Sequence, residues 1–166
     1  AMTSGRGNSV DEALDYLRRS ALADGTHPPG TIYFVRNDDI RSVTRHRASG
    51  VAVEQPFDKA VKQLSRLGVR AETIEGNTPR RKRDVQGAMM GTVHLRWAKS
   101  GSRILPGAIC EHLTSYGGRM VSPSKRKGQQ ARLSELLRYG AAAASGTVSE
   151  PYARQWKFPT PMIQVH

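Results

Sequence analysis

The only cysteine of the chain, Cys110, lies two residues before a histidine, His112, in the segment ILPGAICEHLTSYGG at 104–118. A thiol becomes nucleophilic at neutral pH where a base or a positive environment lowers its pKa. Residues two apart face the same side of a strand but diverge on a helix, so the spacing alone does not establish a catalytic pair. His94 is an alternative base on a neighbouring predicted strand. The residues therefore offer Cys110 as a nucleophile, with His112 or His94 as its general base.

The alternative interpretation is a buried structural cysteine beside a surface histidine. Small and apolar neighbours, Ala108 and Ile109, favour burial, and lone cysteines are often inert. In both interpretations the apolar residues carry polar groups to the edge of a sheet. The candidates for a substrate-binding crevice at that edge are Thr114, Ser115, Gly117 and Gly118.

A second candidate site is the segment GTVSEPYARQWKFPTP at 146–161. Its carboxylate, Glu150, follows a run of small residues, and Tyr152 is close behind it. In open α/β sheets the loops at the carboxyl ends of strands build the ligand crevice, so Glu150 and Tyr152 are further substrate-binding candidates. The alternative is a proline-rich loop with ordinary aromatic anchoring.

The charge of the chain is strongly positive. Lys and Arg number 26 against 14 Asp and Glu, which gives 26 − 14 = +12. Such an excess raises affinity for polyanions, although solubility or a genomic bias toward Arg would produce it too. Few aromatic residues accompany the basic clusters, so a stacking platform for single strands is not supported. Two clusters in predicted loops could contact phosphates, and their residues are Arg80, Arg81, Lys82, Arg83, Lys125, Arg126 and Lys127.

Other chemistries find little support. One cysteine excludes an internal disulfide and a cysteine-based zinc site, and no H-E-x-x-H pattern joins His94, His112, Glu111 or Asp84. The glycines lack the spacing of a phosphate-binding loop or a dinucleotide fingerprint. No apolar run reaches the roughly 18 residues of a membrane span, and no signal peptide precedes residue 9. The sequence predicts neither a metal nor a cofactor.

The first half of the chain predicts a βαβ unit. A capping box of Ser9 and Glu12 begins a helix over 9–23, and the run TIYFV at 31–35 predicts a buried strand. A second helix over 56–67 has Gly68 just past its end, and a strand over 69–74 follows. Strand, helix and strand in this order favour a parallel sheet.

The second half is less regular. Asp84 is predicted to cap a short helix through Met90, and the alternation at 92–97 predicts a strand. A third helix is expected over 129–139, a small-residue strand over 141–148, and a final strand at 162–166 that stops without a turn. We therefore expect an α/β fold of three layers, with a mainly parallel sheet flanked by helices. It would form one domain over 10–166 after a disordered tail at 1–9, and the chain would be a C-terminally truncated fragment of a larger one.

Several segments together resemble a family of uncharacterised bacterial proteins. The matching stretches are "ILPGAICEHLTSYGG", "LLRYGAAAASGTVSEPY", "KFPTP", "TIYFVRNDDIRS" and "AVKQLSRLGVRAETIEG", which cover most of residues 10–166. The family consists of large, apparently exported proteins of planctomycetes and some proteobacteria, and it has no established activity. The resemblance implies an exported or periplasmic location and a chain that continues beyond Val165-His166.

A more distant similarity is to caspase-like domains, including the gingipain and CHAT groups. In those domains a strand leads to the catalytic cysteine, and "GAIC" at 107–110 resembles that position, which implies Cys110 as nucleophile. Those peptidases carry His-Gly after the preceding strand, whereas this chain reads Met90-Gly-Thr-Val-His94, with the histidine three residues late. An inactive caspase-like binding domain is therefore at least as consistent with the residues as a peptidase.

These observations lead to three functional hypotheses. The first is a non-catalytic binding or scaffolding module of an exported protein, with a protein or peptide as its partner. The second is a caspase-like cysteine peptidase with Cys110 as nucleophile. The third is a basic domain that binds polyanions or nucleic acid through its two basic loops.

Overall fold

The computed structural model describes residues 9–26, 29–37, 39, 56–119, 130–150 and 161–164. Four parts of the chain with predictions lie outside the described residues: residues 1–8 of the predicted tail at 1–9, the cluster at 125–127, Tyr152 and the end of the chain at 165–166. The helices and strands are α1 (Val10–Ala23), β1 (Thr31–Arg36), α2 (Phe57–Arg66), β2 (Arg70–Glu75), β3 (Val85–Met90), β4 (Ile104–His112), α3 (Leu133–Arg138) and β5 (Ala143–Ser145), with short 3-10 turns η1 (Trp97–Lys99) and η3 (Pro161–Gln164).

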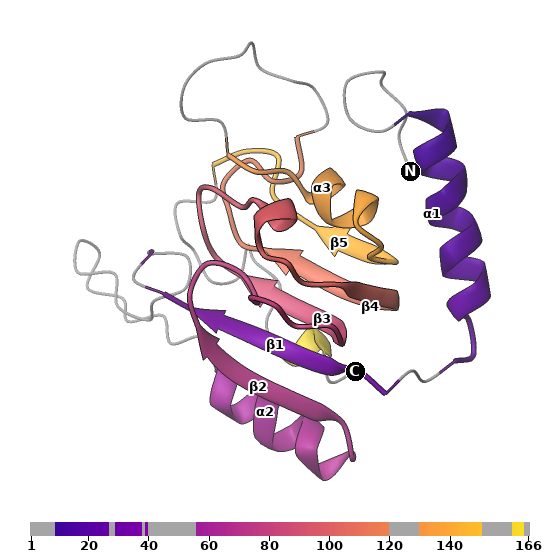
Figure 1. Cartoon of the computed structure of the whole chain (residues 1–166). Helices are drawn as coiled ribbons and strands as arrows, with labels where there is room; N and C mark the ends of the chain where they lie inside the picture. The colour runs from indigo at the N-terminus through magenta and orange to yellow at the C-terminus, as the bar shows by residue number, and fades with distance from the viewer. Residues whose placement is uncertain are drawn as a thin grey trace.

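The five strands form one parallel sheet in the order β2-β1-β3-β4-β5 (Figure 1). This confirms the predicted α/β class with a parallel sheet. The chain runs outward from β1 to β2 and then returns to add the other three strands on the opposite side of β1, which is a doubly wound order. The switch of direction lies between β1 and β3, where the connections that leave the carboxyl ends of the two strands run to opposite faces of the sheet.

The two faces of the sheet are covered differently. On one face, Phe57, Ala60 and Leu64 of α2 pack against Phe34 of β1, with 5.3 Å between the two phenylalanine ring centroids. On the other face, α3, η1 and the loops beside them cover a cluster that includes Tyr33. Successive residues of β1 thus enter opposite clusters, which explains why TIYFV reads as an unbroken apolar run.

Two predictions for the middle of the chain are wrong. The segment capped by Asp84 is the central strand β3, because Met89 and Met90 are fully buried in the clusters on opposite faces of the sheet. The predicted strand at 92–97 is an irregular crossover that ends in η1. Tertiary burial overrides the helical preference of the sequence QGAMM in the first case.

Three later elements are shorter or different from their predictions. The third helix is only α3, because Arg132 is still extended and Gly140 has a φ of +119°. The predicted strand at 141–148 is the three-residue β5, which pairs with β4 at the edge of the sheet. Residues 162–164 belong to a 3-10 turn instead of a strand.

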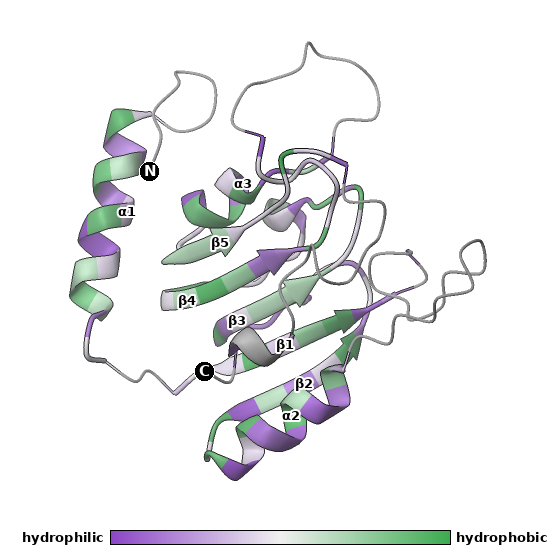
Figure 2. Cartoon of the chain, turned by 180° about the vertical axis from the view of Figure 1, so that it is seen from behind, coloured by the Kyte–Doolittle hydropathy of each residue, from purple (hydrophilic) through white to green (hydrophobic). Residues whose placement is uncertain are grey.

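The first helix forms as predicted but packs little. Ser9 Oγ accepts from the backbone N–H of Glu12 at 3.1 Å, and a Glu12 carboxylate oxygen accepts from the backbone N–H of Ser9 at 2.8 Å. Only Ala13 is buried, whereas Leu17 is 54% and Leu22 79% exposed. Figure 2 shows α1 at the margin of the molecule with apolar residues along its length. The helical period of the sequence is therefore real, although most of its apolar face is open.

Replacement of Met89 by Ala tests the assignment of 85–90 to a central strand. We expect the free energy of unfolding to fall by about 2–5 kcal/mol, because the substitution leaves a cavity beneath α2. The matched control is Leu22→Ala on the exposed side of α1, which should change stability by less than about 0.5 kcal/mol. Denaturant titration measures both, and equal losses would contradict the assignment.

Candidate functional site

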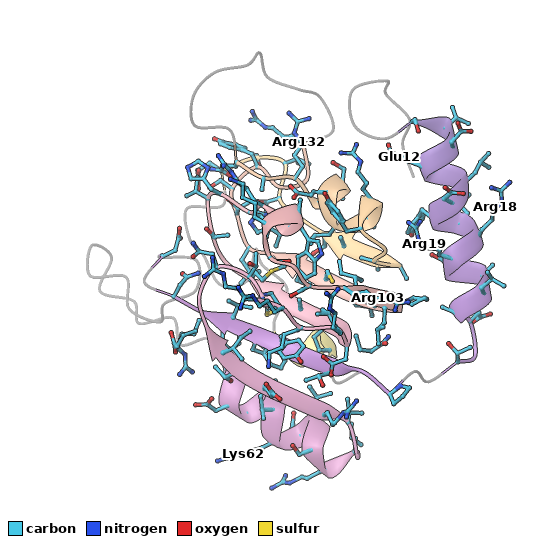
Figure 3. The ribbon with its side chains drawn as sticks, in the orientation of Figure 1. Glu12, Arg18, Arg19, Lys62, Arg103 and Arg132 are labelled. Carbon is cyan, nitrogen blue, oxygen red and sulfur yellow. The ribbon has the colours of Figure 1, made fainter. Side chains whose placement is uncertain are left out.

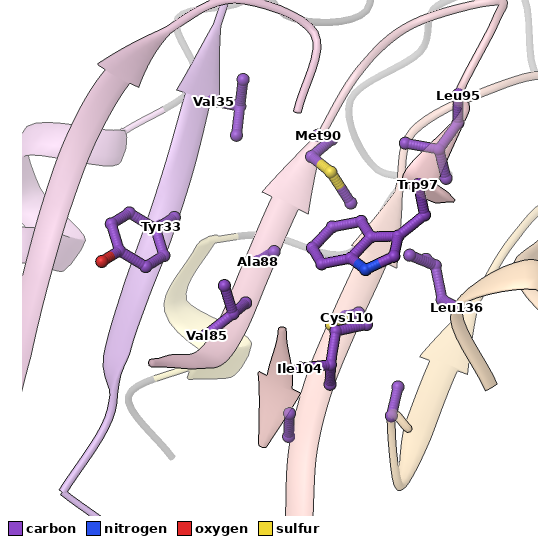
Figure 4. Packing of buried hydrophobic residues seen from close by; sticks show 12 residues of the cluster. Tyr33, Val35, Val85, Ala88, Met90, Leu95, Trp97, Ile104, Cys110 and Leu136 are labelled. Atoms are coloured by element: carbon purple, nitrogen blue, oxygen red, sulfur yellow. The ribbon is translucent and has the colours of Figure 1, made fainter. Parts of the chain in front are cut away.

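The Cys110 thiol lies inside the apolar core. It is fully buried in a cluster with Ala88, Trp97 and Leu136 (Figure 4). Burial, together with the smaller effect of the neighbouring Glu111 carboxylate, raises the pKa of Cys110 to about 12. The thiol is therefore protonated at neutral pH, the opposite of what a nucleophile requires. This geometry favours the structural interpretation of the cysteine.

The two candidate bases are held elsewhere. His112 is buried at the end of β4, where its Nε2 lies 2.8 Å from the backbone carbonyl of Thr92. His94 is exposed in the irregular crossover after β3. No hydrogen bond joins either imidazole to the Cys110 thiol within the described part of the chain. The structure thus describes all three predicted catalytic residues, and neither histidine is hydrogen-bonded to the cysteine.

The four residues predicted to line a crevice after β4 are all buried. Thr114 is buried and donates through Oγ1 to Gln130 Oε1 at 2.7 Å, and that oxygen also accepts from the backbone of Tyr116 at 2.8 Å. The Thr147 hydroxyl lies 2.6 Å and 2.8 Å from the carbonyls of Thr114 and Ser115. These bonds join the segments that follow β4 and β5, so Thr114 and Ser115 serve the fold.

Glycines permit a direct crossing of backbones at this edge. A Cβ on Gly118 would lie 2.3 Å from the carbonyl oxygen of Gly146, and a Cβ on Gly146 would lie 2.7 Å from the Gly118 nitrogen. The Gly118 N–H donates to the Thr147 carbonyl at 2.9 Å. Gly117 is buried beside it, and Glu150 is partly buried at the end of its described segment. The glycines therefore permit the close packing of the two backbones.

Two polar residues at the carboxyl edge of the sheet, Asn37 and Glu111, were not predicted as site residues from the sequence. Asn37 donates through Nδ2 to the carbonyls of Gly76 and Gly91, each at 3.0 Å, so it ties together the ends of β1, β2 and β3. Glu111 is 3% exposed, accepts from the Ser145 hydroxyl, and has a pKa raised by burial. Asn37 directly follows a buried strand, which is the only sequence signal for its role. Both residues close the edge where doubly wound sheets commonly bind ligands.

The basic loop at 79–83 is one half of a larger surface. The Arg81 N–H donates to the Ser100 carbonyl at 2.9 Å, and the Arg103 N–H donates to the Lys82 carbonyl at 2.8 Å. Ser102 Oγ accepts from the Lys82 N–H at 3.0 Å and donates to the Pro79 carbonyl at 2.8 Å. Two crossovers, 78–84 and 91–103, are therefore bonded side by side. We call the surface that they form the basic face.

The basic face concentrates charge. Its two segments hold seven Lys and Arg and one acidic residue, so 7 − 1 = +6, which is half of the charge of the chain. The acidic residue, Asp84, accepts from Thr31 Oγ1 at 2.6 Å and from the Tyr33 hydroxyl at 2.8 Å, and its pKa is lowered, chiefly by the Thr31 hydrogen bond. Asp84 is thus engaged within the fold.

Only one cation of the basic face has an acidic partner among the described residues. Lys82 pairs with Glu72 at 3.3 Å and lies 4.9 Å above the centroid of the Tyr33 ring. Figure 3 shows Arg103 at the amino end of β4, far from Lys62 on α2. The remaining cations are exposed and form no ion pair with any described carboxylate: Arg80, Arg81, Arg83, Arg96, Lys99 and Arg103.

Metal and membrane sites find no geometric support in the described ranges. No group of three or more His, Cys, Asp or Glu side chains there is placed to hold a metal ion. None of the helices described is both long and apolar enough to span a bilayer.

Gly118→Ala tests the backbone crossing. The added methyl would collide with the Gly146 carbonyl, so we expect a loss of roughly 2 kcal/mol or more in the free energy of unfolding. The control is Gly25→Ala, where φ is +68° but no atom lies within 4 Å, so only the backbone penalty of about 1 kcal/mol applies. Thermal or denaturant unfolding that ranks Gly25→Ala as the more harmful change would refute the crossing.

Comparisons with known proteins identify no relative of this chain. No family model matches the chain, and neither a curated protein nor a solved structure is significantly similar to it. The functional assignment therefore rests on the basic face and on the buried cluster around Cys110.

Proposed function

We propose that this chain is a non-catalytic domain that binds polyanions through its basic face. The observation that carries the proposal is the set of six exposed cations that have no carboxylate partner among the described residues. They project from two crossovers whose backbones are hydrogen-bonded to each other, so their Cα positions are fixed relative to one another.

Fixed cations favour polyanion binding for a physical reason. Each cation that neutralises a charge on a polyanion releases a condensed counterion, and the entropy of that release drives association. The cations also steer a negatively charged ligand toward the surface before contact. A surface whose backbone is already fixed loses little conformational entropy on binding, so more of this free energy contributes to affinity.

A peptidase function has no supporting observation beyond the presence of Cys110. We therefore include in the proposal that the domain is caspase-like but inactive, as a member of the exported bacterial family that the sequence resembles. A parallel sheet with the cysteine near the carboxyl end of β4 supports the first part of this assignment, and the enclosed thiol supports the second.

Thiol labelling tests whether Cys110 can act as a nucleophile. A disulfide reagent should leave Cys110 unmodified in the native protein at pH 7 and at pH 9, and it should label the residue once the chain is unfolded in urea, because burial holds the pKa near 12. Labelling of the native protein at neutral pH would contradict the assignment.

The raised pKa of Cys110 also predicts a pH dependence of the free energy of unfolding. The contribution of the buried thiol to stability is present below the ordinary thiol pKa and is lost as pH rises toward 12. Cys110→Ala should lack this share of the pH dependence.

Charge removal tests the basic face. In the variant Arg83→Ser/Lys99→Ser/Arg103→Ser, the slope of log affinity for heparin against log salt should be smaller than in the wild type, since three contacts that release counterions are lost. The matched control is Lys59→Ala/Lys62→Ala/Arg66→Ala on the outer side of α2, which removes the same charge from the opposite face. Isothermal titration over a salt series measures both. Equal slopes for the two variants would mean that only the net charge of the protein determines binding, and would refute a localised site.

A further inference from the structure

We propose that the ligand of the basic face is the phosphate backbone of a nucleic-acid duplex, bound without reading its sequence, and that Arg81 is the positioned contact of that face. This inference rests on the proposed polyanion function and adds the class of ligand and the residue that anchors it.

The backbone of Arg81 is the first observation. Arg81 has a φ of +54°, and it is the only residue other than glycine with a positive φ in the part of the chain that the structure describes. An L-residue is strained in this left-handed region, whereas glycine adopts it freely. The strain is maintained by the surrounding fold, since the Arg81 N–H is bonded to the Ser100 carbonyl. The fold would therefore accept glycine here at least as well as arginine.

The neighbourhood of Arg81 directs its side chain. Gly101, which has a φ of +67°, lies directly across from it, and the Arg81 Cγ atom is 3.7 Å from the place where a Gly101 Cβ would be. The arginine stem thus rests on the bare backbone of the second crossover. Its guanidinium has no acidic partner among the described residues. Arg81 thus combines a strained backbone with a guanidinium that has no acidic partner among the described residues. Strain of this kind is often kept at functional sites, so the combination points to a role in binding.

The composition of the basic face selects the ligand class. Five of its seven cations are arginines, whose planar fork matches the oxygens of a phosphate group in a two-point contact. The two segments of the basic face contain no Asn or Gln, which are the usual readers of adenine, and the neighbouring Asn77 accepts from Asn37 Nδ2 at 3.2 Å. We therefore expect contacts to phosphates and no dependence on base sequence.

The buried aromatics favour a duplex over a single strand. Single-stranded nucleic acids are held largely by stacking of bases on aromatic side chains. Tyr33 and Trp97 are only 2% and 1% exposed, and Lys82 further covers the Tyr33 ring. The one exposed ring on the two crossovers is the imidazole of His94. A duplex, which keeps its bases stacked and presents its phosphates outward, fits this surface better.

The experiment measures binding and folding separately in the full chain. Fluorescence anisotropy over a salt series follows binding to two short DNA duplexes of unrelated sequence, to a single strand and to heparin, and thermal unfolding follows stability. For Arg81→Gly we expect the salt slope on the duplex to fall by about 0.9, with a thermal midpoint equal to or above that of the wild type. Arg81→Lys should keep the slope but bind more weakly, because it retains the charge without the fork. The control Lys62→Ala should change neither quantity.

The outcomes separate the two proposals. Equal affinity of the wild type for both duplexes, above that for the single strand, supports the assigned ligand. Retention by heparin without binding to duplex DNA would overturn the ligand class but leave the polyanion function in place. Absence of binding to every polyanion would overturn the proposed function itself. Duplex binding with an unchanged slope in Arg81→Gly, or a lowered thermal midpoint in that variant, would overturn the role of Arg81.

Discussion

A buried sheet face has to be covered, and two of the four crossovers in this domain cover it without an α-helix. The crossover from β2 to β3 has no helix, and the one from β3 to β4 has only the short turn η1. Helices satisfy their own backbone groups, whereas loops over a core must find partners for each N–H and carbonyl. The two crossovers solve this by bonding to each other, and Trp97 fills the space between them and the sheet. The basic face and the enclosure of Cys110 both follow from this cover.

The cover also explains where the charge lies. A loop over an apolar face can use the aliphatic stems of Lys and Arg as part of its packing while the charged ends stay in water. Lys82 shows the arrangement, since its ammonium lies above the Tyr33 ring and reaches Glu72. A helical crossover would have supplied leucines for the same purpose. Lys82 is therefore part of the packing of this face as well as of its charge.

The sequence was informative where local pattern and burial agree. The capping box at Ser9, the βαβ unit and the stop at Gly68 were all predictable, because each depends on residues close in sequence. Strand β3 was not, because its residues lack the β-branched pattern of a strand and are held by neighbours on both sides.

The candidate site was predictable only in part, for a similar reason. The small residues before Cys110 correctly indicated burial, but its enclosure depends on Trp97 and Leu136, which come from separate crossovers. The crossing of Gly118 and Gly146 required knowing that β4 and β5 are adjacent. Nothing local to Arg81 indicated its left-handed backbone.

The two outer strands of the described sheet bear on how the domain avoids unwanted association. An open strand edge can recruit a strand from another chain, and short or charged edges discourage this. On one side, β2 exposes three charged residues along the edge, Arg70, Glu72 and Glu75. On the other side, β5 is only three residues long, and the chain leaves it at once to cross Gly118. The tight glycine crossing thus also limits the length of ladder that a foreign strand could extend.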